Sequence, residues 1–182
     1  RLSHPRVARH VGDGRAPDGQ PYLAMEWIEG AELGPAIERG ALSLADSLRV
    51  ARGAAEALAA IHAQGIVHRD LKPSNLMLRA GSIQQLVLVD FGLARRLDAN
   101  TRVTASAALI GTPHYMSPEQ ASGAQEVGPA ADVFALGCIF YECLTGKHPF
   151  KAGQLVGVLA RISFDTPEPV SSVRPSVPPL WS

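Results

Sequence analysis

With 182 residues, of which 46% are hydrophobic, the chain is long and apolar enough to bury the core of one domain or one large lobe, and disorder is excluded. Its 17 Lys and Arg residues equal its 17 Asp and Glu residues, so net charge indicates neither nucleic acid nor an anionic membrane as partner. No apolar run approaches the ~18 residues of a membrane span, and the N-terminus lacks a signal-peptide pattern, so we expect a cytoplasmic protein without a membrane segment.

The first third of the chain predicts two strands and one long helix. Residues 7–11 and 21–28 flank the turn-rich loop GDGRAPDGQ and are interpreted as paired strands. A helix is predicted to begin at Ser43, because Asp46 three residues later suits a capping box, and to end at Gly65. Its predicted apolar stripe consists of Leu44, Leu48, Ala51, Ala55, Leu58 and Ile61.

A hairpin and a long loop follow this helix. The short apolar runs at 75–78 and 85–89 flank RAGSIQ, which predicts two strands joined by a turn. Residues 92–129 are rich in Ala, Thr, Ser, Gly and Pro and are interpreted as an extended loop segment.

The C-terminal third predicts a buried helix and then irregular chain. Pro129 opens a nearly all-apolar helix that ends at Gly146, and its apolar character favours a place in the core. Cys138 and Cys143 within it suit buried thiols in a reducing compartment. A further helix is predicted over 153–163, and the proline-rich stretch after it predicts irregular chain or a linker.

Three polar motifs follow one another along the chain at regular intervals. They are HRDLKPSN at residues 68–75, DFG at 90–92 directly after a predicted strand, and GTPHYMSPE at 111–119. The apolar helix containing Asp132 comes next. In this order the motifs resemble the eukaryotic-type (Hanks-type) protein kinase family, specifically bacterial serine/threonine kinases, in its catalytic loop, metal-binding turn, activation segment and central helix.

The resemblance covers essentially the whole chain and implies an α+β, protein-kinase-like fold. It assigns residues 1–28 to the last two strands of the small lobe and the hinge, 29–164 to the mostly helical large lobe, and 165–182 to an irregular proline-rich segment. The family's glycine-rich loop, strand lysine and partner glutamate would precede residue 1, and the final large-lobe helices would follow residue 182. We therefore expect a partial catalytic domain, truncated at both ends and fused to further domains, that alone binds ATP weakly and transfers phosphate poorly.

The resemblance also implies roles for the polar side chains of the motifs. Asp70 would accept or orient the proton of the substrate hydroxyl, and Lys72 would meet the transferring phosphate as a cation. Asn75 and Asp90 would bind Mg²⁺, which prefers hard oxygen ligands. Thr112 would bridge Asp70 and Lys72, and it agrees with the lysine of DLKPSN in indicating a serine/threonine kinase. The implied reaction transfers the γ-phosphate of ATP to Ser or Thr hydroxyls of proteins.

The segment YLAMEWIEGAEL resembles the hinge between the kinase lobes. Met25 would be the gatekeeper behind the adenine, the backbones of Glu26 and Ile28 would bond the edge of the ring, and Met77 would lie beneath it. Glu32 would reach the ribose. Alternatively, both methionines are ordinary core residues and Glu32 is a carboxylate near a helix N-terminus.

A regulatory role is implied for Arg69, which could pair with a phosphate on the activation segment and order that segment. The candidate phosphate acceptors are Thr101, Thr104 and Ser106. The alternative is that Arg69 packs against a carbonyl and that the hydroxyls are solvated loop residues.

Other residues of the motifs are expected to be structural. His68 would pack under Phe91, Gly92 would allow a sharp turn, and Glu119 would lack the arginine with which the family pairs it. Asp132 would accept hydrogen bonds from the catalytic-loop backbone near His68 and Arg69, because a buried carboxylate needs donors. The remaining histidines show no metal-ligand spacing and are expected to be structural: His4, His10, His62, His114 and His148.

The sequence offers three alternatives to an active protein kinase. A non-catalytic kinase-like module for binding or regulation is disfavoured by the retained motif residues, although the missing small-lobe elements favour it. A small-molecule phosphotransferase shares the Asp-to-Asn spacing but does not usually carry a GT…SPE segment. Nucleic-acid binding has neither a basic patch nor an aromatic platform to support it.

Overall fold

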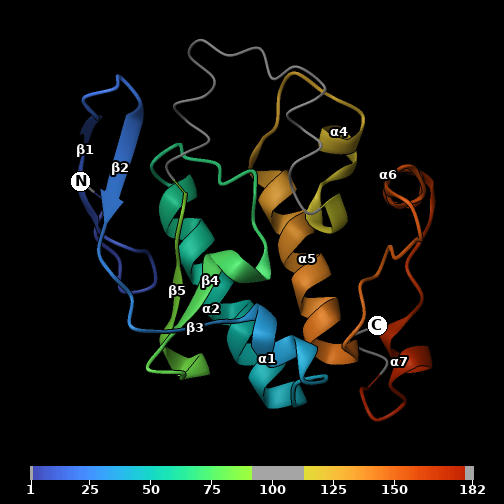
Figure 1. Cartoon of the computed structure of the whole chain (residues 1–182). Coiled ribbons are helices and arrows are strands. Elements are labelled where there is room, and N and C mark those ends of the chain that lie inside the picture. The colour runs from blue at the N-terminus through green and yellow to red at the C-terminus, as the bar shows by residue number, and fades with distance from the viewer. Residues whose placement is uncertain (1, 92–112, 179–182) are drawn as a thin grey trace.

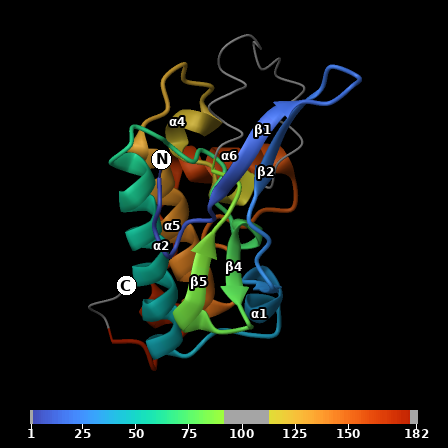
Figure 2. The same cartoon turned by 90° about the vertical axis from the view of Figure 1, so that its left-hand side faces the viewer.

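The computed structural model describes residues 2–91 and 113–178. Two helices lie side by side at its centre, α2 (Leu44–His62) and α5 (Pro129–Thr145), as Figure 1 shows. An antiparallel sheet in the order β3-β4-β5 packs against α2 through β5, and a separate antiparallel hairpin, β1-β2, lies beyond one end of this sheet (Figure 2). The strands are β1 (His10–Arg15), β2 (Pro21–Met25), β3 (Gly30–Glu32), β4 (Leu76–Arg79) and β5 (Leu86–Leu88). The other helices are α1 (Gly34–Glu38), α4 (Pro118–Ala121), α6 (Leu155–Phe164) and α7 (Val170–Val173).

Helix α2 begins where predicted but ends at His62, before the predicted end at Gly65, and it buries a different face. Ser43 caps it, since its Oγ accepts a hydrogen bond from the Asp46 backbone N–H at 3.0 Å. The buried side chains are Ser47, Val50, Ala54, Ala57, Leu58 and Ile61, with Gly53 beside them. Leu58 and Ile61 were predicted correctly, whereas Ala55 is exposed. The helix holds so many alanines that more than one apolar stripe can be drawn along it, and packing against β5 and α5 selects one of them.

Three further predicted elements are confirmed. Strands β4 and β5 pair as a hairpin, with Leu76 opposite Leu88. Helix α5 begins at Pro129 and ends before Gly146, whose φ of 71° is the left-handed conformation that glycine adopts readily at a helix end. Helix α6 lies within two residues of its predicted bounds at each end.

The β1-β2 hairpin is displaced from its prediction. Strand β1 runs through the glycine-rich segment that was interpreted as a turn, and β2 ends at Met25. A register irregularity between His10 and Gly12 starts this pairing, and the Tyr22 ring covers Gly14 from the opposite strand. A Cβ at Gly14 would lie only 2.8 Å from the Tyr22 hydroxyl oxygen, so glycine here makes room for the ring instead of forming a turn.

The C-terminal segment is more ordered than its prolines predicted. It contains the helical turn α7, and Val170 and Val177 are buried against Leu144 of α5. The Arg174 guanidinium donates hydrogen bonds to the carbonyl oxygens of Leu42 at 2.6 Å and Leu144 at 2.9 Å. These contacts hold the segment against the ends of α2 and α5. Strand β3 and the helices α1 and α4 were also not predicted from the sequence.

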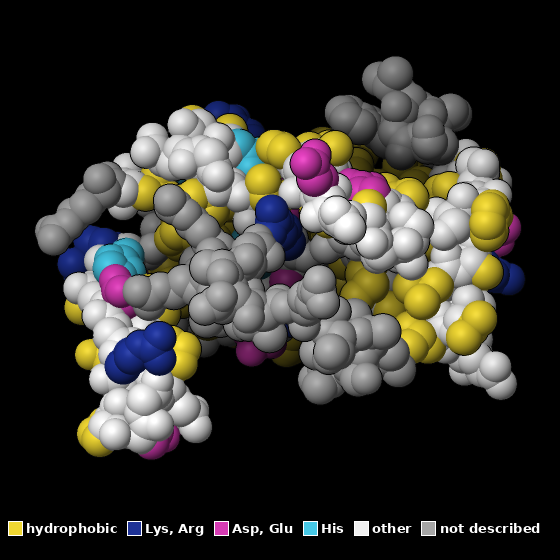
Figure 3. Space-filling model, turned by 90° about the horizontal axis from the view of Figure 1, so that it is seen from above, with side chains coloured by type: hydrophobic (Ala, Val, Ile, Leu, Met, Phe, Trp, Pro, Cys, Tyr) yellow, Lys and Arg dark blue, Asp and Glu magenta, His cyan; other side chains and the backbone are white. Residues whose placement is uncertain are grey.

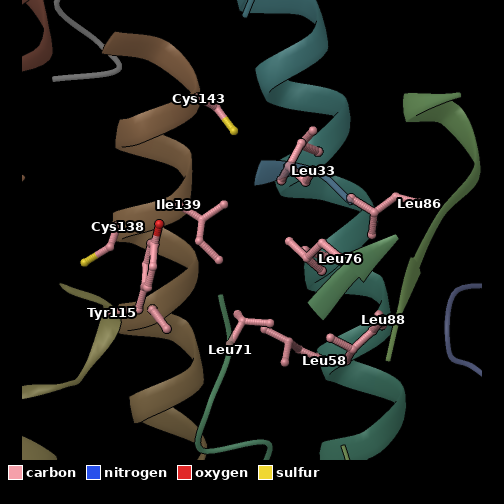
Figure 4. Close-up of a cluster of buried hydrophobic side chains, with 14 of the residues drawn as sticks. Leu33, Leu58, Leu71, Leu76, Leu86, Leu88, Tyr115, Cys138, Ile139 and Cys143 are labelled. Atoms are coloured by element: carbon pink, nitrogen blue, oxygen red, sulfur yellow. The ribbon is translucent and has the colours of Figure 1, made fainter. Parts of the chain in front are cut away.

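The main hydrophobic core lies between α2, α5 and the three-stranded sheet. In Figure 4, Ile139 of α5 points toward α2, while Leu76 of β4 and Leu88 of β5 approach the same core from the sheet. All three of these side chains are fully buried. Cys138 and Cys143 are free and buried, as predicted, and burial raises the pKa of each thiol to about 12. None of the helices within the described ranges is both long and apolar enough to span a lipid bilayer.

Candidate active site

The catalytic loop connects the end of α2 to the start of β4. It closes with a single helical turn, Pro73–Asn75, directly before β4. Lys72 has an extended backbone, with φ −155° and ψ 165°. In extended chain, residues two apart project to the same side, so Lys72 can reach Asp70. Its Nζ lies 2.7 Å from Asp70 Oδ2, and the Asp70 side chain is 61% exposed to solvent.

A buried carboxylate from α5 anchors the start of this loop. Asp132 is only 1% exposed, and its Oδ2 and Oδ1 accept hydrogen bonds from the backbone N–H groups of His68 and Arg69, both at 2.8 Å. Both are backbone N–H groups of the catalytic loop, as predicted. His62, the last residue of α2, adds a third contact from its Nε2 to Oδ2 at 2.7 Å. With three donors, the buried charge is well satisfied.

His68 connects the catalytic loop to the end of β5. Its Nε2 lies 3.1 Å from the Val89 carbonyl oxygen, and its Nδ1 lies 3.3 Å from the Asp70 backbone nitrogen. Because a carbonyl can only accept and an N–H can only donate, the ring must carry its proton on Nε2 and leave Nδ1 as the acceptor. The buried imidazole therefore joins Asp70 to the residue directly before Asp90.

Asn75 adds a second link between the same two chain segments. The Asn75 side chain is buried and donates from Nδ2 to the Asp70 carbonyl oxygen at 2.8 Å, while the Asn75 backbone carbonyl oxygen accepts from the Val89 N–H at 2.9 Å. Asp90 follows with a φ of 60°, a conformation that non-glycine residues adopt rarely and that recurs at functional sites. The two predicted metal ligands thus lie at the ends of one hydrogen-bonded junction.

The chemistry of this donor set fits Mg²⁺. The Asn75 amide nitrogen is engaged, so a cation would be bound by Oδ1, and the exposed Asp90 supplies a carboxylate. Both are hard oxygen donors, and Mg²⁺ is commonly held by one or two side chains, with water and phosphate oxygens completing its shell. Within residues 2–91 and 113–178, no group of three or more His, Cys, Asp or Glu side chains forms a metal cluster.

Three of the predicted adenine contacts come together at the hinge. Ile28 is buried with Val87 of β5, and Met25 and Met77 pack against the same small cluster. Glu26 makes two hydrogen bonds to the backbone of Arg9. Its backbone N–H donates to the Arg9 carbonyl at 2.9 Å, and its Oε1 accepts from the Arg9 N–H at 3.2 Å.

Glu32 lies outside this cluster. It is exposed at the end of β3, in register with Met77. Trp27, between Glu26 and Ile28, has a side chain that is 90% exposed.

The end of the activation segment contacts the catalytic loop. Ser117 caps the short helix α4 in a capping box with Gln120, whose Nε2 also donates to the Arg69 carbonyl oxygen at 2.7 Å. Glu119 is half-buried in the same helix, and no ion pair of its carboxylate occurs in the described part of the chain. Phe91 belongs to the main core. Five residues with predicted roles lie outside the described residues: Gly92, Thr101, Thr104, Ser106 and Thr112.

A second polar cluster joins the turn before α4 to α5. The buried Tyr115 hydroxyl donates to Glu142 Oε2 at 2.6 Å, and the rings of His114 and His148 stack with centroids 4.4 Å apart. Burial raises the pKa of Glu142 and lowers the pKa of both histidines. The Lys151 ammonium lowers both histidine pKa values further. Although Glu142 lies 3.5 Å from His148 Nε2, burial and Lys151 outweigh its attraction.

The face seen from above carries charged side chains of both signs. In Figure 3, acidic and basic side chains are interspersed with hydrophobic ones over the part that the grey residues leave uncovered. Charge on that part of the surface is therefore mixed, as the equal numbers of acidic and basic residues in the sequence suggested.

The contacts of His62 and Gln120 and the Tyr115–Glu142 contact were not predicted from the sequence. One of them had a local signal: Ser117 and Gln120 have the S-x-x-Q spacing of a capping box, which predicts a helix start inside the supposed loop. His62 and Glu142 had none, because their partners lie 70 and 27 residues away in the sequence.

Comparisons with known proteins agree with this geometry. A family profile described as the protein kinase domain matches residues 1–166. The chain is 48% identical over 149 residues to the probable serine/threonine-protein kinase PkwA of Thermomonospora curvata, covering 81% of this chain and 19% of that protein. It is 38% identical over 176 residues to the serine/threonine-protein kinase PknB of Mycobacterium tuberculosis, covering 94% of this chain and 28% of that protein. It thus spans less than a third of the length of either relative.

A solved structure has the same fold. The crystal structure of Rad53 1-466 in complex with AMP-PNP matches with a TM-score of 0.71 and 28% sequence identity. The match covers 89% of this chain and 39% of that one.

Proposed function

This chain belongs to the protein kinase family, and we propose that it is the catalytic domain of a protein serine/threonine kinase that uses Mg²⁺ and ATP. The observation that carries this proposal is the junction between the catalytic loop and the end of β5. His68 and Asn75 tie Asp70 to Val89, so the proton acceptor and the metal ligand Asp90 belong to one rigid unit. Phosphoryl transfer depends on such positioning, since there is little covalent chemistry for the protein to perform.

In the proposed reaction Asp70 receives or orients the hydroxyl proton of the protein substrate. Its exposed carboxylate is accessible to a substrate, while the backbone on either side of it is fixed. Lys72, now paired with Asp70, would also lie beside the transferring phosphate and neutralise its charge. Because the two side chains are in contact, the proton acceptor and the cation lie together at the place where phosphate would be transferred.

Asn75 Oδ1 and the Asp90 carboxylate would hold the magnesium ion. Bound there, the ion neutralises charge on the phosphates of ATP. Met25, Ile28 and Met77 would form the apolar surface around the adenine, and the hinge backbone at Glu26 and Ile28 would bond its edge.

The nature of the acceptor is inferred from the motifs and the relatives. Lys72 at its motif position is typical of serine/threonine kinases, and PkwA and PknB carry that designation. We further propose, from the sequence, that the protein lies in the cytoplasm, acts in signalling and is fused to further domains. Arg69 and the activation-segment hydroxyls would regulate it.

The test measures transfer of ³²P from γ-labelled ATP to a generic Ser/Thr protein substrate with Mg²⁺. The 182-residue chain and the complete open reading frame that contains it are assayed in parallel, which also tests the expected slow turnover of the chain alone. Asp70→Asn should reduce kcat by about 10²- to 10⁴-fold, the usual contribution of a positioned proton acceptor. Asp90→Ala should remove the Mg²⁺-dependent part of nucleotide binding.

Asp165→Asn is the matched control for Asp70→Asn. It makes the same charge change at a side chain of similar exposure, 54% against 61%, at the C-terminal end of α6. The control should transfer phosphate like the unaltered protein. Full activity of Asp70→Asn, or Mg²⁺-dependent ATP binding that survives Asp90→Ala, would refute the proposed function.

A further inference from the structure

The Gln120 side chain uses both ends of its amide. Its Oε1 accepts from the Ser117 backbone N–H at 3.0 Å, and its Nε2 donates to the Arg69 carbonyl oxygen at 2.7 Å. The reverse orientation would set NH₂ against N–H and oxygen against oxygen, so the hydrogen-bond network fixes which end faces which partner. One side chain thus connects the segment before α4 to the catalytic loop, across 51 residues of sequence.

The carbonyl that Gln120 binds belongs to the peptide group directly before Asp70. Arg69 has a φ of 65°, a backbone conformation that a residue other than glycine adopts only when its surroundings hold it. Asp132 holds the Arg69 N–H, His68 Nδ1 accepts from the Asp70 N–H, and Gln120 holds the carbonyl between them. The peptide plane that aims the Asp70 side chain is therefore fixed at both of its polar atoms.

The choice of glutamine over glutamate cannot be explained by helix capping. A capping box requires an acceptor at the third helical position, and a carboxylate serves there at least as well because the helix N-terminus favours negative charge. A donor at this position is needed only for the Arg69 carbonyl. The cavity lined by Arg69, Asp70 and Gln120 has a volume of about 30 Å³, which leaves room for only a few water molecules beside the amide.

We propose that Gln120 is a positioning residue for phosphoryl transfer. It holds the peptide group between Arg69 and Asp70 while Arg69 keeps its left-handed backbone conformation, and it couples that geometry to the end of the activation segment. This inference rests on the proposed role of Asp70. Gln120 itself acts only through the backbone of the catalytic loop.

Gln120→Glu is the sharpest test, because it changes the amide into a carboxylate of the same shape. It keeps an acceptor for the Ser117 N–H and replaces the donor to the Arg69 carbonyl with a carboxylate oxygen that faces this carbonyl. In the complete open reading frame, kcat should fall about tenfold, the effect of losing one well-placed hydrogen bond, while KM for MgATP stays within about twofold. The midpoint of thermal unfolding should fall by a few degrees, as the loss of one hydrogen bond predicts, whereas Gln120→Ala, which also loses the capping box, should lower it further.

Amide hydrogen exchange supplies a readout that does not depend on activity. In Gln120→Glu, protection of the Asp70 amide should decrease and protection of the Ser117 amide should persist. Unchanged exchange at Asp70, or a kcat equal to that of the unaltered protein, would overturn the positioning role even if Asp70→Asn abolishes transfer. Conversely, failure of Asp70→Asn to affect transfer would refute the proposed function, and the exchange measurement would still decide whether Gln120 holds this peptide group.

Discussion

Replacing Asp132 with asparagine should destabilise the fold by about 2–4 kcal/mol. The carboxylate is buried and meets three donors: the backbone N–H groups of His68 and Arg69 and the ring of His62. Asparagine has the same shape but only one acceptor oxygen. In its better orientation that oxygen faces His68 and His62, and the amide NH₂ then meets the Arg69 N–H.

The magnitude follows from counting these contacts. An unsatisfied, buried N–H at Arg69 costs about 1–3 kcal/mol, and each of the two remaining bonds loses about 1 kcal/mol when its acceptor becomes neutral. The neutral amide avoids the desolvation of a buried charge, which offsets part of this loss. The catalytic loop lies directly at these donors, so activity should fall with stability.

The assay is equilibrium unfolding in urea, followed by far-ultraviolet circular dichroism. Asp165→Asn, at an exposed aspartate, should remain within about 0.5 kcal/mol of the unaltered chain. If Asp132→Asn were as stable as Asp165→Asn, the three hydrogen bonds would contribute nothing net and the anchoring of the catalytic loop by α5 would be wrong.

Two further predictions concern the polar cluster between the turn before α4 and α5. Tyr115→Phe should lower the free energy of unfolding by about 1.5–3 kcal/mol, because it removes the hydroxyl that donates to the buried carboxylate of Glu142, and the same urea titration measures it. Without that donor the pKa of Glu142 should rise further; equal stability of the two proteins at neutral pH would contradict this contact. The free energy of unfolding should also fall as the pH is lowered from about 7.5 to 5.5, because the pKa values of His114 and His148 lie below the ordinary value of 6.5 in the folded state, so that the unfolded chain binds more protons in this range. This stability is complete above the unfolded pKa and is lost as pH falls below it, and Lys151 opposes protonation of both rings. Burial raises the pKa of Glu142, so protonation of Glu142 in the folded state offsets part of the fall. Replacing both histidines with asparagine should flatten the pH dependence, whereas an unchanged slope would show that these rings are not its source.

Some of the fold could be read from neighbouring residues. Ser43 with Asp46 marked the start of α2, and Pro129 with Gly146 marked both ends of α5. In each case the signal lies within the first or last turn of the element, because helix ends need partners for backbone groups that have none inside the helix. The hairpin β4-β5 was predicted in the same way, from two apolar runs around a short turn.

The errors arose where a long-range contact overrode a local pattern. Gly12 and Gly14 looked like turn residues, but pairing with β2 and the ring of Tyr22 made them part of a strand. The prolines near the C-terminus indicated irregular chain, but the Arg174 guanidinium bonds carbonyl oxygens at the ends of distant segments and holds a helical turn against the core. Neither outcome has a signal within the few residues concerned.

By itself the sequence determined the family, the order of its polar motifs, and therefore which residues are candidates for proton acceptor, cation and metal ligands. Only the tertiary structure decided how these residues are held: Gln120 on the Arg69 carbonyl across 51 residues, and His62 on Asp132 across 70. The physical reason is the range of the interactions. Caps, turns and motif spacings depend on atoms within a few residues of one another, whereas the partners of a buried amide or carboxylate are set by which helices and loops pack together.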